Sequence, residues 1–237
     1  MNPGRRVLVL GATGRLGGGI ARALARRGDR VVLTARDRGK LEALAAEVGP
    51  LPGTAAPFVR ADLVDESAPE AIVQGIRAST GRIDDIVIAC GPSPRTPFES
   101  LRREDLRHTL AVHAVAPLLL VHALAGDLTE ARGTVVALTD AGVTRPYTNH
   151  VAYLTAKGAL QTGLRALAVE LAPEVRVNMV SLGIVVDPDA DGDPLQMHRL
   201  ATRSPLGRFC SVEEVVHVVV SLLDATWATG EIWGVGR

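Results

Sequence analysis

The feature that most constrains the fold is a series of short apolar runs, rich in Val and Ile, that recur between stretches of helical pattern. A solvent-facing strand would alternate polar with apolar residues, so runs this apolar are typical of parallel strands covered by helices on both faces. We expect strands at Val7 to Leu10, Arg30 to Thr34, Ala56 to Arg60, Asp85 to Cys90, Gly133 to Leu138, Val175 to Val180 and Ile232 to Val235. The pattern predicts an α/β fold: a Rossmann-like, doubly wound parallel sheet of about seven strands with helices on both faces.

The length and composition of the chain indicate one globular unit. It has 237 residues, of which 47% are hydrophobic and 22% charged, which is enough to bury a sizeable core without the composition of disorder. We interpret residues 1–237 as a single domain. The one stretch of low hydrophobicity, 187–194, is too short for a linker and predicts a loop beside a site, with a substrate lid near 184–207.

The charge and the cysteine content of the chain limit the classes of binding partner that we expect. The formal net charge is zero, which gives no electrostatic footprint for nucleic acid or an anionic membrane. The longest apolar stretches fall short of the ~18 to 20 residues that span a bilayer, and no leader pattern opens the chain. Cys90 and Cys210 stand far apart, and the histidines lack ligand spacing, so we predict no metal. These features predict a cytoplasmic protein with a small-molecule partner.

A glycine-rich turn follows the first predicted strand. Gly11, Gly14 and Gly17 allow a tight turn, close approach of the backbone to a pyrophosphate, and close packing of helix on strand. The helix that follows offers its amide-bearing N-terminus to phosphates. This context predicts a dinucleotide site, and the alternative is a plain strand-to-helix connection.

The end of the second predicted strand bears on which dinucleotide binds. The acid that would bind the ribose 2′-hydroxyl of NAD is expected there, but the sequence reads Thr34-Ala35-Arg36-Asp37. Arg36 could bind a 2′-phosphate through charge-assisted hydrogen bonds, and Arg15 could reach the same group. We therefore predict NADPH. In the alternative reading Arg36 is solvated and Asp37 is only a helix N-cap.

Tyr153 and Lys157 lie four residues apart, on one face of a predicted helix. An ammonium beneath a phenol favours the ionised form, so the pair suits an acid for hydride chemistry, unless the two are an ordinary half-buried Tyr and a surface Lys. Asp140, upstream, offers only acceptors when ionised and would repel a developing alkoxide. It favours a C=N bond in a pterin-like ring, or else it is a strand-terminal residue that caps the next turn.

These residues resemble the short-chain dehydrogenase/reductase superfamily over nearly the whole chain. The matching segments are the glycine turn, Asp62-Leu63, and residues 153–160, 175–178 and 204–209. The resemblance implies that Asp140, Tyr153, Lys157 and His113 are catalytic and that Lys157 also holds the nicotinamide ribose. It further implies that the protein is a homo-oligomer, with the tetramer that is usual in the family. The cofactor contacts that it implies are Gly11, Thr13, Gly14, Arg15, Leu16, Gly17, Arg36, Asp62, Leu63, Ala89, Cys90, Gly91, Tyr153, Lys157, Gly183 and Ile184.

Within that superfamily the chain is most similar to pteridine and dihydromonapterin reductases, which share an Arg in the glycine turn, as at Arg15, and an Asp thirteen residues before the Tyr, as at Asp140. This similarity implies an NADPH-dependent reductase of a pterin-like or other C=N or C=O substrate, with Tyr153 as proton donor assisted by Lys157 and Asp140. The alternatives are a carbonyl reductase of the 3-oxoacyl type and a non-catalytic NADP-binding protein of the same fold.

The chain departs from the superfamily pattern in four places. Ile88-Ala89-Cys90-Gly91 stands where the superfamily commonly has Asn-Asn-Ala-Gly after the fourth strand, so the usual Asn side chains are absent and Gly91 keeps the backbone turn. His113 replaces a helix Asn, and is either a relay group or a satisfied core histidine. The segment 91–97 lacks the aromatic residue that would stack on a pterin, and the candidates to replace it are Tyr147, Phe98, Phe209 and Trp233. Residues 233–237 lack the usual Val-Asp-Gly-Gly.

Overall fold

A computed structural model describes residues 4–50, 53–185, 198, 201–202 and 204–236. They contain a seven-stranded sheet in the order β3-β2-β1-β4-β5-β6-β7, in which every neighbouring pair is parallel. The strands are β1 (Arg6–Leu10), β2 (Arg30–Ala35), β3 (Phe58–Arg60), β4 (Asp85–Ile88), β5 (Thr134–Asp140), β6 (Arg176–Leu182) and β7 (Ile232–Val235). The prediction of a doubly wound parallel sheet is confirmed.

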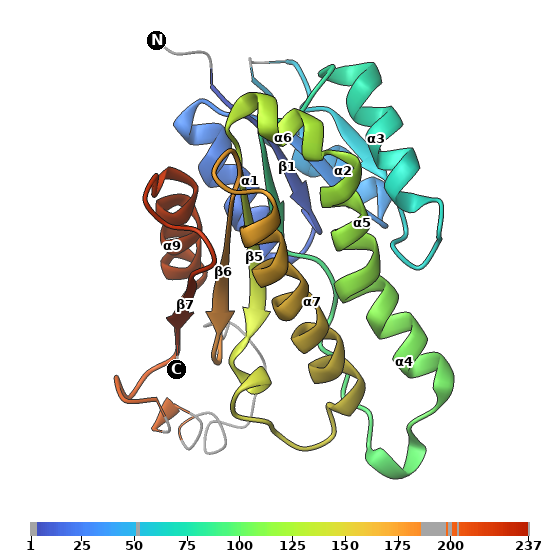
Figure 1. Cartoon of the computed structure of the whole chain (residues 1–237), viewed down its shortest axis with the longest axis vertical. Coiled ribbons are helices and arrows are strands. Elements are labelled where there is room, and N and C mark those ends of the chain that lie inside the picture. The colour runs from blue at the N-terminus through green and yellow to red at the C-terminus, as the bar shows by residue number, and fades with distance from the viewer. Residues whose placement is uncertain (1–3, 51–52, 186–197, 199–200, 203, 237) are drawn as a thin grey trace.

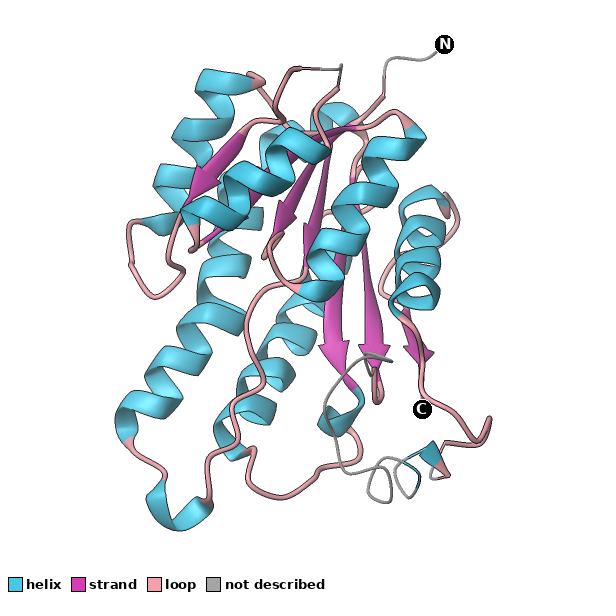
Figure 2. Ribbon diagram, turned by 180° about the vertical axis from the view of Figure 1, so that it is seen from behind, coloured by secondary structure: helices cyan, strands magenta, loops and turns pink. Residues whose placement is uncertain are grey.

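Helices cover both faces of the sheet. The layer formed by α3, α5 and α7 is in front of the sheet in Figure 1, and the layer formed by α1, α2 and α9 is in front in Figure 2. The helices are α1 (Arg15–Arg27), α2 (Arg38–Glu47), α3 (Ala68–Ser79), α4 (Arg103–Leu110), α5 (Ala116–Ala123), α6 (Ala125–Ala131), α7 (Val151–Glu170) and α9 (Val212–Asp224). Shorter turns are η1 (Phe98–Ser100), the π-helical η2 (Ala111–Val115) and η3 (Ala141–Val143).

Two hydrophobic cores explain why the strands are apolar throughout. Successive residues of β1 point to opposite faces, so Leu8 joins the core under α3, α5 and α7 while Val7 and Val9 join the core under α1, α2 and α9. All three side chains are fully buried. Burying a side chain of this size contributes about 1.5 to 3 kcal/mol, so both faces of the strand stabilise the fold.

The strands differ from the predicted ranges at their ends, and one difference affects the site. β5 continues past Leu138 to Asp140, which pairs with Leu182 of β6. The apolar run ends earlier, but a ladder of backbone hydrogen bonds needs no apolar side chain. β4 ends at Ile88 instead of Cys90, and β3 begins at Phe58 because the Ala56 amide donates to the Ala45 carbonyl of α2.

One continuous helical stretch, Arg103–Ala123, is long and apolar enough to cross a membrane by length and composition alone. It consists of α4, η2 and α5, a length that the sequence pattern did not reveal. Val121 and Leu120 of this stretch lie in the core beneath α5. A buried core helix of a globular fold has the same composition, so the stretch is weak evidence for a membrane span.

The segment 187–194, predicted to form a loop beside the site, lies outside the described residues, as does much of the predicted lid near 184–207. The lid and the single-domain boundary both remain predictions.

Candidate active site

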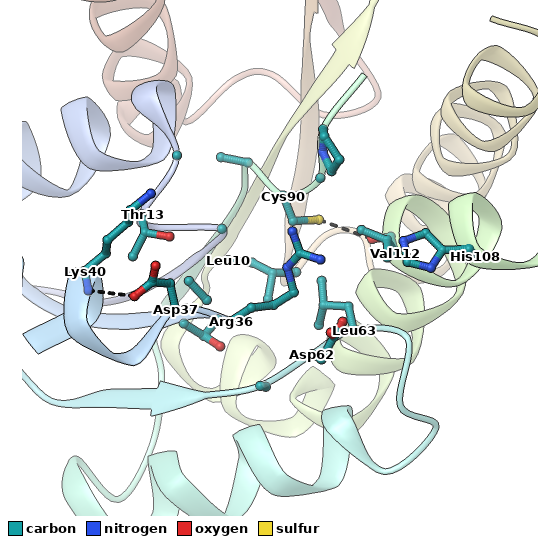
Figure 3. A pocket seen from close by; sticks show the side chains of 18 residues that line it. Leu10, Thr13, Arg36, Asp37, Lys40, Asp62, Leu63, Cys90, His108 and Val112 are labelled. Atoms are coloured by element: carbon teal, nitrogen blue, oxygen red, sulfur yellow. Dashed lines mark hydrogen bonds between the residues drawn. The ribbon is translucent and has the colours of Figure 1, made fainter. Parts of the chain in front are cut away.

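A cavity of about 670 Å³ opens where the strand order reverses, between the carboxyl ends of β1 and β4. In open α/β sheets this reversal point is where ligands bind, because the loops after neighbouring strands diverge there. The residues that surround the cavity are shown in Figure 3. The predicted cofactor residues among them are Gly11, Thr13, Gly14, Arg36, Asp62, Leu63, Ala89, Cys90 and Gly91.

The glycine turn has the geometry that the sequence predicts. Gly11 has a φ of +82°, and a Cβ at this position would lie 2.6 Å from the Cα of Cys90. A Cβ at Gly17 would lie 2.2 Å from the Gly11 carbonyl oxygen, so α1 packs against the turn only with glycine there. A Cβ at Gly14 would meet only the Gly11 oxygen, at 3.4 Å, so this face is open to the cavity. The side chain of Leu16 packs against the core and does not line the cavity, so its cofactor contact stays a prediction.

The N-terminus of α1 is suited to an anion. Gly14 is the N-cap, no side chain caps the helix, and no acidic residue lies in its first turn. The amides of a first helical turn carry a partial positive charge and await an acceptor. The turn therefore fits a phosphate group, as the sequence predicts.

The wall formed by the β2–α2 connection is cationic. Arg36 and Lys40 both line the cavity, and Figure 3 shows Arg36 extending into it. The carboxylate of Asp37 accepts the Lys40 amide at 3.0 Å and so caps α2. This is the N-cap role considered for Asp37 at the sequence level, but Arg36 faces the cavity rather than bulk solvent alone.

Arg15 does not join Arg36. Its guanidinium donates to the Val185 carbonyl at 2.6 Å, across the turn to the chain that leaves β6, and it does not line the cavity. In this conformation the two guanidinium groups lie apart, and a shared contact with one phosphate stays a prediction. The side chain at the start of α1 points toward the opposite end of the site, where β6 ends.

The remaining predicted contacts lie at the same carboxyl edge. Asp62 accepts the Val64 amide at 3.2 Å and so shapes the turn after β3. Gly183 donates its amide to Val235 at 2.7 Å, and Ile184 follows it. Both residues border β7 and lie outside the cavity lining.

Asp140 and Tyr153 are brought together. The Tyr153 hydroxyl, from the first turn of α7, donates to Asp140 Oδ2 at 2.9 Å, and Asp140 is the last residue of β5. Asp140 Oδ1 accepts the Gly142 amide at 2.7 Å and so also caps η3. Asp140 is therefore both a cap and a site residue, because Oδ1 caps η3 while Oδ2 binds the Tyr153 hydroxyl.

The pKa of Tyr153 is set mainly by burial and by Asp140. Burial, followed by the negative charge of Asp140 and the hydrogen bond to it, raises the pKa of Tyr153 above its ordinary value. The Lys157 ammonium lies 5.8 Å from the ring centroid and donates to the Leu138 carbonyl at 2.9 Å. Burial and Asp140 therefore dominate the pKa of Tyr153, which is a neutral phenol that holds its proton at pH 7, and stabilisation of the ionised form by Lys157 stays a prediction.

Lys157 is itself buried, and burial lowers the pKa of its ammonium while Cys90 and Asp140 oppose that effect. Cys90 lines the cavity and its thiol contacts the Val112 carbonyl at 3.4 Å. Burial raises the pKa of the Cys90 thiol to about 11, partly offset by Lys157. Cys90 is therefore a neutral thiol in the cavity wall and not a nucleophile.

His113 packs between the cavity and Tyr153. Its ring is edge-to-face with Tyr153, with centroids 5.2 Å apart, and its Nε2 lies 2.9 Å from the Pro92 carbonyl. Burial and the Lys157 ammonium lower the pKa of His113 to about 3, so the ring is neutral. Nε2 carries the proton in this assignment, which leaves Nδ1 as a buried acceptor with no partner among the described residues. The imidazole is thus only half satisfied.

The segment after β4 requires a glycine at residue 91 because the His113 imidazole packs against it. Gly91 has a φ of +90°, and a Cβ there would lie 2.1 Å from His113 Cε1. No sequence pattern predicts this contact, because the two residues come from different elements 22 positions apart.

The position of Tyr147 in the site could not be predicted from the sequence. Its hydroxyl donates to the same Asp140 oxygen as Tyr153, at 3.1 Å, and its ring is edge-to-face with His150 at 4.7 Å. The sequence offered four candidates for an aromatic near the substrate without a way to choose among them. Of the others, Phe98 is 70% exposed and Trp233 packs beside Trp227. Lys40 and His108 also line the cavity and were not predicted.

Within the described part of the chain, no group of three or more His, Cys, Asp or Glu side chains is placed to hold a metal ion. The prediction that the protein uses no metal stays a prediction.

This fold and this cavity define a dinucleotide-binding protein of the doubly wound class, and comparison with known proteins narrows the class. Residues 11–236 match a family model described as enoyl-(acyl carrier protein) reductase. L-xylulose reductase of Bos taurus is 34% identical over 93% of this chain and 89% of its own length. D-threitol dehydrogenase of Mycolicibacterium smegmatis is 30% identical over 92% of this chain and 85% of its own length.

The chain therefore belongs to the short-chain dehydrogenase/reductase superfamily, and the prediction of an oxidoreductase of that superfamily is confirmed. A solved structure of L-sorbose reductase from Gluconobacter frateurii, complexed with NADPH and L-sorbose, is similar with a TM-score of 0.90. It is 24% identical and covers 98% of this chain and 95% of its own, which supports the fold.

Proposed function

We propose that the chain is an NADPH-dependent reductase that transfers a hydride to a small molecule with a pterin-like C=N bond, with Tyr153 as the proton donor. The observation that carries the proposal is the 2.9 Å hydrogen bond from the Tyr153 hydroxyl to Asp140 Oδ2, next to the buried ammonium of Lys157. An acid, a cation and an acceptor-only carboxylate thus meet at the carboxyl edge of the sheet. This proposal places the chain in the pteridine reductase branch of its superfamily.

The cavity fits the cofactor part by part. The open face of Gly14 and the uncapped N-terminus of α1 suit a pyrophosphate. Arg36 and Lys40 suit a 2′-phosphate, since a guanidinium offers paired donors and an ammonium adds a point charge. Lys157 would hold the nicotinamide ribose. When bound, NADPH supplies the hydride.

The proton comes from this chain. Tyr153 is 7% exposed and stays neutral at pH 7, so it can donate to the atom that gains negative charge as the substrate is reduced. The Lys157 ammonium then offsets the charge of the phenolate. Nδ1 of His113, a buried acceptor beside the Tyr153 ring, supports a part for His113 in holding a hydrogen-bond donor such as a water near the site.

Asp140 favours the class of substrate. An ionised carboxylate accepts hydrogen bonds and repels a developing alkoxide, so it suits a substrate that presents ring N–H or amino groups. Donors of this kind lie beside the C=N bond of a pterin. A 3-oxoacyl substrate offers no such donor near its ketone, so the carboxylate disfavours it.

A second candidate is a polyhydroxylated carbonyl compound. The relatives named for L-xylulose and D-threitol support it, and hydroxyl groups can also donate to Asp140. A third reading is a binder without catalysis. The replacement of the usual Asn residues by Ile88 and Ala89 supports it, and the Tyr153–Asp140 contact argues against it.

The test is steady-state turnover with dihydropterin and with L-xylulose, each with NADPH and with NADH, followed by the absorbance of reduced nicotinamide. We expect dihydropterin to be reduced with NADPH preferred. Asp140→Asn, which keeps the shape but not the charge, and Asp140→Ser should each lower kcat/KM for dihydropterin by about 10- to 100-fold, the loss of one or two hydrogen bonds to a charged group. Asp140→Ser should also raise turnover of a simple ketone. Turnover of L-xylulose alone would support the second candidate, and no turnover the third.

We also propose that the protein forms a homo-oligomer, with a tetramer as the family expectation. Val115 of η2 and Leu119 of α5 are each about half exposed, at 51% and 49%, which supports a further apolar contact on that helix. Light scattering measures the mass directly. A cytoplasmic location stays a prediction.

A further inference from the structure

Asp140 Oδ2 accepts two phenols at once, from Tyr153 at 2.9 Å and from Tyr147 at 3.1 Å. A carboxylate oxygen has about two acceptor directions, so these two donors fill it. The other oxygen, Oδ1, accepts the Gly142 amide at 2.7 Å. A substrate group that donates to Oδ2 must therefore take the position of one phenol.

The two phenols are held very differently. Tyr153 is 7% exposed and belongs to the 20-residue helix α7. Tyr147 is 42% exposed and belongs to the connection 144–150 between η3 and α7. Tyr153 can turn its O–H toward a substrate, but moving its oxygen away from Asp140 would unpack α7 from the core, whereas the whole Tyr147 side chain can swing into water. Tyr147 is therefore the phenol that a substrate donor can displace from Asp140 Oδ2.

The surroundings of Tyr147 favour such an exchange. A Cβ built on Gly142 would lie 2.4 Å from Tyr147 Cε1 and 2.9 Å from Asp140 Oδ1, so the ring lies directly over the backbone that positions the carboxylate. The segment opposite is tied to the same connection, because the Thr96 amide donates to the Asn149 carbonyl at 2.7 Å. A substrate reaching Asp140 between these segments meets Tyr147 first.

We propose that Tyr147 is a specificity-determining residue whose hydroxyl competes with a hydrogen-bond donor of the substrate for Asp140 Oδ2. Substrates that carry an N–H or O–H donor beside the reduced bond exchange one hydrogen bond for another. A substrate without a donor leaves Tyr147 in place and finds the carboxylate occupied. The inference rests on the proposed function for the identity of the donor, but not for the competition itself.

The composition of the chain makes the exchange observable. Tyr147 and Tyr153 are its only two tyrosines, so tyrosine isotopically labelled at Cζ gives two NMR resonances, which Tyr147→Phe assigns. The full chain is titrated, with NADP⁺ present, with three probes. They are pterin, a pterin in which methyl groups replace every N–H hydrogen, and L-xylulose.

We expect pterin to move the Tyr147 resonance toward the value of tyrosine free in water, and the methylated pterin to leave it in place. Tyr147→Phe should lower KM for dihydropterin by about 3- to 10-fold, because the competing donor is gone, whereas Tyr147→Leu, which also loses the ring, should not. A merely structural role predicts that both variants change KM and kcat in the same direction for every substrate.

The outcomes separate this inference from the proposed function. If L-xylulose moves the Tyr147 resonance and pterin does not, the competition holds and the pterin proposal fails. If pterin binds and is reduced while the Tyr147 resonance stays in place, the inference is overturned and the pterin proposal stands. Equal shifts with pterin and its methylated form, or no shift with any probe, also overturn the inference.

Discussion

The two ends of the same sheet both carry charged groups, but the charges are arranged differently. At the amino ends, Arg5 is paired with Asp85, and Arg6 with Asp84 at 2.9 Å. Asp85 also accepts the Thr134 amide of β5 at 2.7 Å, so the ion pair joins the strands β1, β4 and β5. At this end each buried carboxylate faces a guanidinium.

At the carboxyl ends the partners are exchangeable. The Lys157 ammonium donates to a backbone carbonyl at 2.9 Å, and Asp140 accepts two phenols and an amide. These partners can be replaced by the groups of a ligand without leaving a buried charge uncompensated. The difference indicates that the amino end serves stability and the carboxyl end serves chemistry.

The strongest way to break this comparison is to remove the proton donor. Tyr153→Phe should lower kcat/KM by about 10³-fold, in the range that general acids contribute, while the free energy of unfolding changes by only about 1 kcal/mol for one hydrogen bond. NADPH oxidation and denaturant unfolding measure the two quantities. A fall in activity of less than about tenfold would remove Tyr153 from its proposed role.

The second test removes an ion pair at the amino ends of the strands. Asp85→Ala should lower the free energy of unfolding by about 3 kcal/mol, because it leaves Arg5 and the Thr134 amide without their buried partner, while kcat stays within about twofold. Glu47→Ala is the matched control, since its pair with Arg22 at 2.7 Å is exposed and should contribute less than about 1 kcal/mol. Equal destabilisation by the two variants would contradict the contrast.

A smaller effect concerns pH and His113. Its pKa in the folded chain, about 3, lies below the ordinary 6.5, so between these values the unfolded chain binds the extra proton. Stability from this residue is therefore full above pH 6.5 and is lost as the pH falls toward 3, by at most about 1.4 kcal/mol per pH unit. His113→Asn should flatten the unfolding free energy across that window. Parallel wild-type and variant curves would show that the imidazole does not contribute.

The sheet could be predicted from the sequence because its signal is local. An apolar run such as residues 7–10 must be buried on both faces, and that requirement alone gives a parallel strand. The end of β5 could not be predicted in this way, since Asp140 belongs to the ladder through its backbone pairing with Leu182 and not through an apolar side chain.

The site was predictable only in part. The spacing of Tyr153 and Lys157 placed both on one helix face, and the glycine turn gave the cavity floor. Three features depend on contacts between distant segments, which no local pattern encodes: Tyr147 on Asp140, Arg15 on Val185, and Gly91 against His113. The pKa of Tyr153 depends on burial and on Asp140, and neither effect follows from the four-residue spacing between Tyr153 and Lys157.

The contact between Gly91 and His113 links two positions in any attempt to re-engineer this protein. A methyl group at residue 91 would lie 2.1 Å from the imidazole, so a library that varies residue 91 beside an unchanged His113 should recover glycine alone. Any side chain at residue 91 would require a smaller residue at position 113 in the same clone. The two positions are thus epistatic, because a side chain at residue 91 finds space only after the imidazole has been removed.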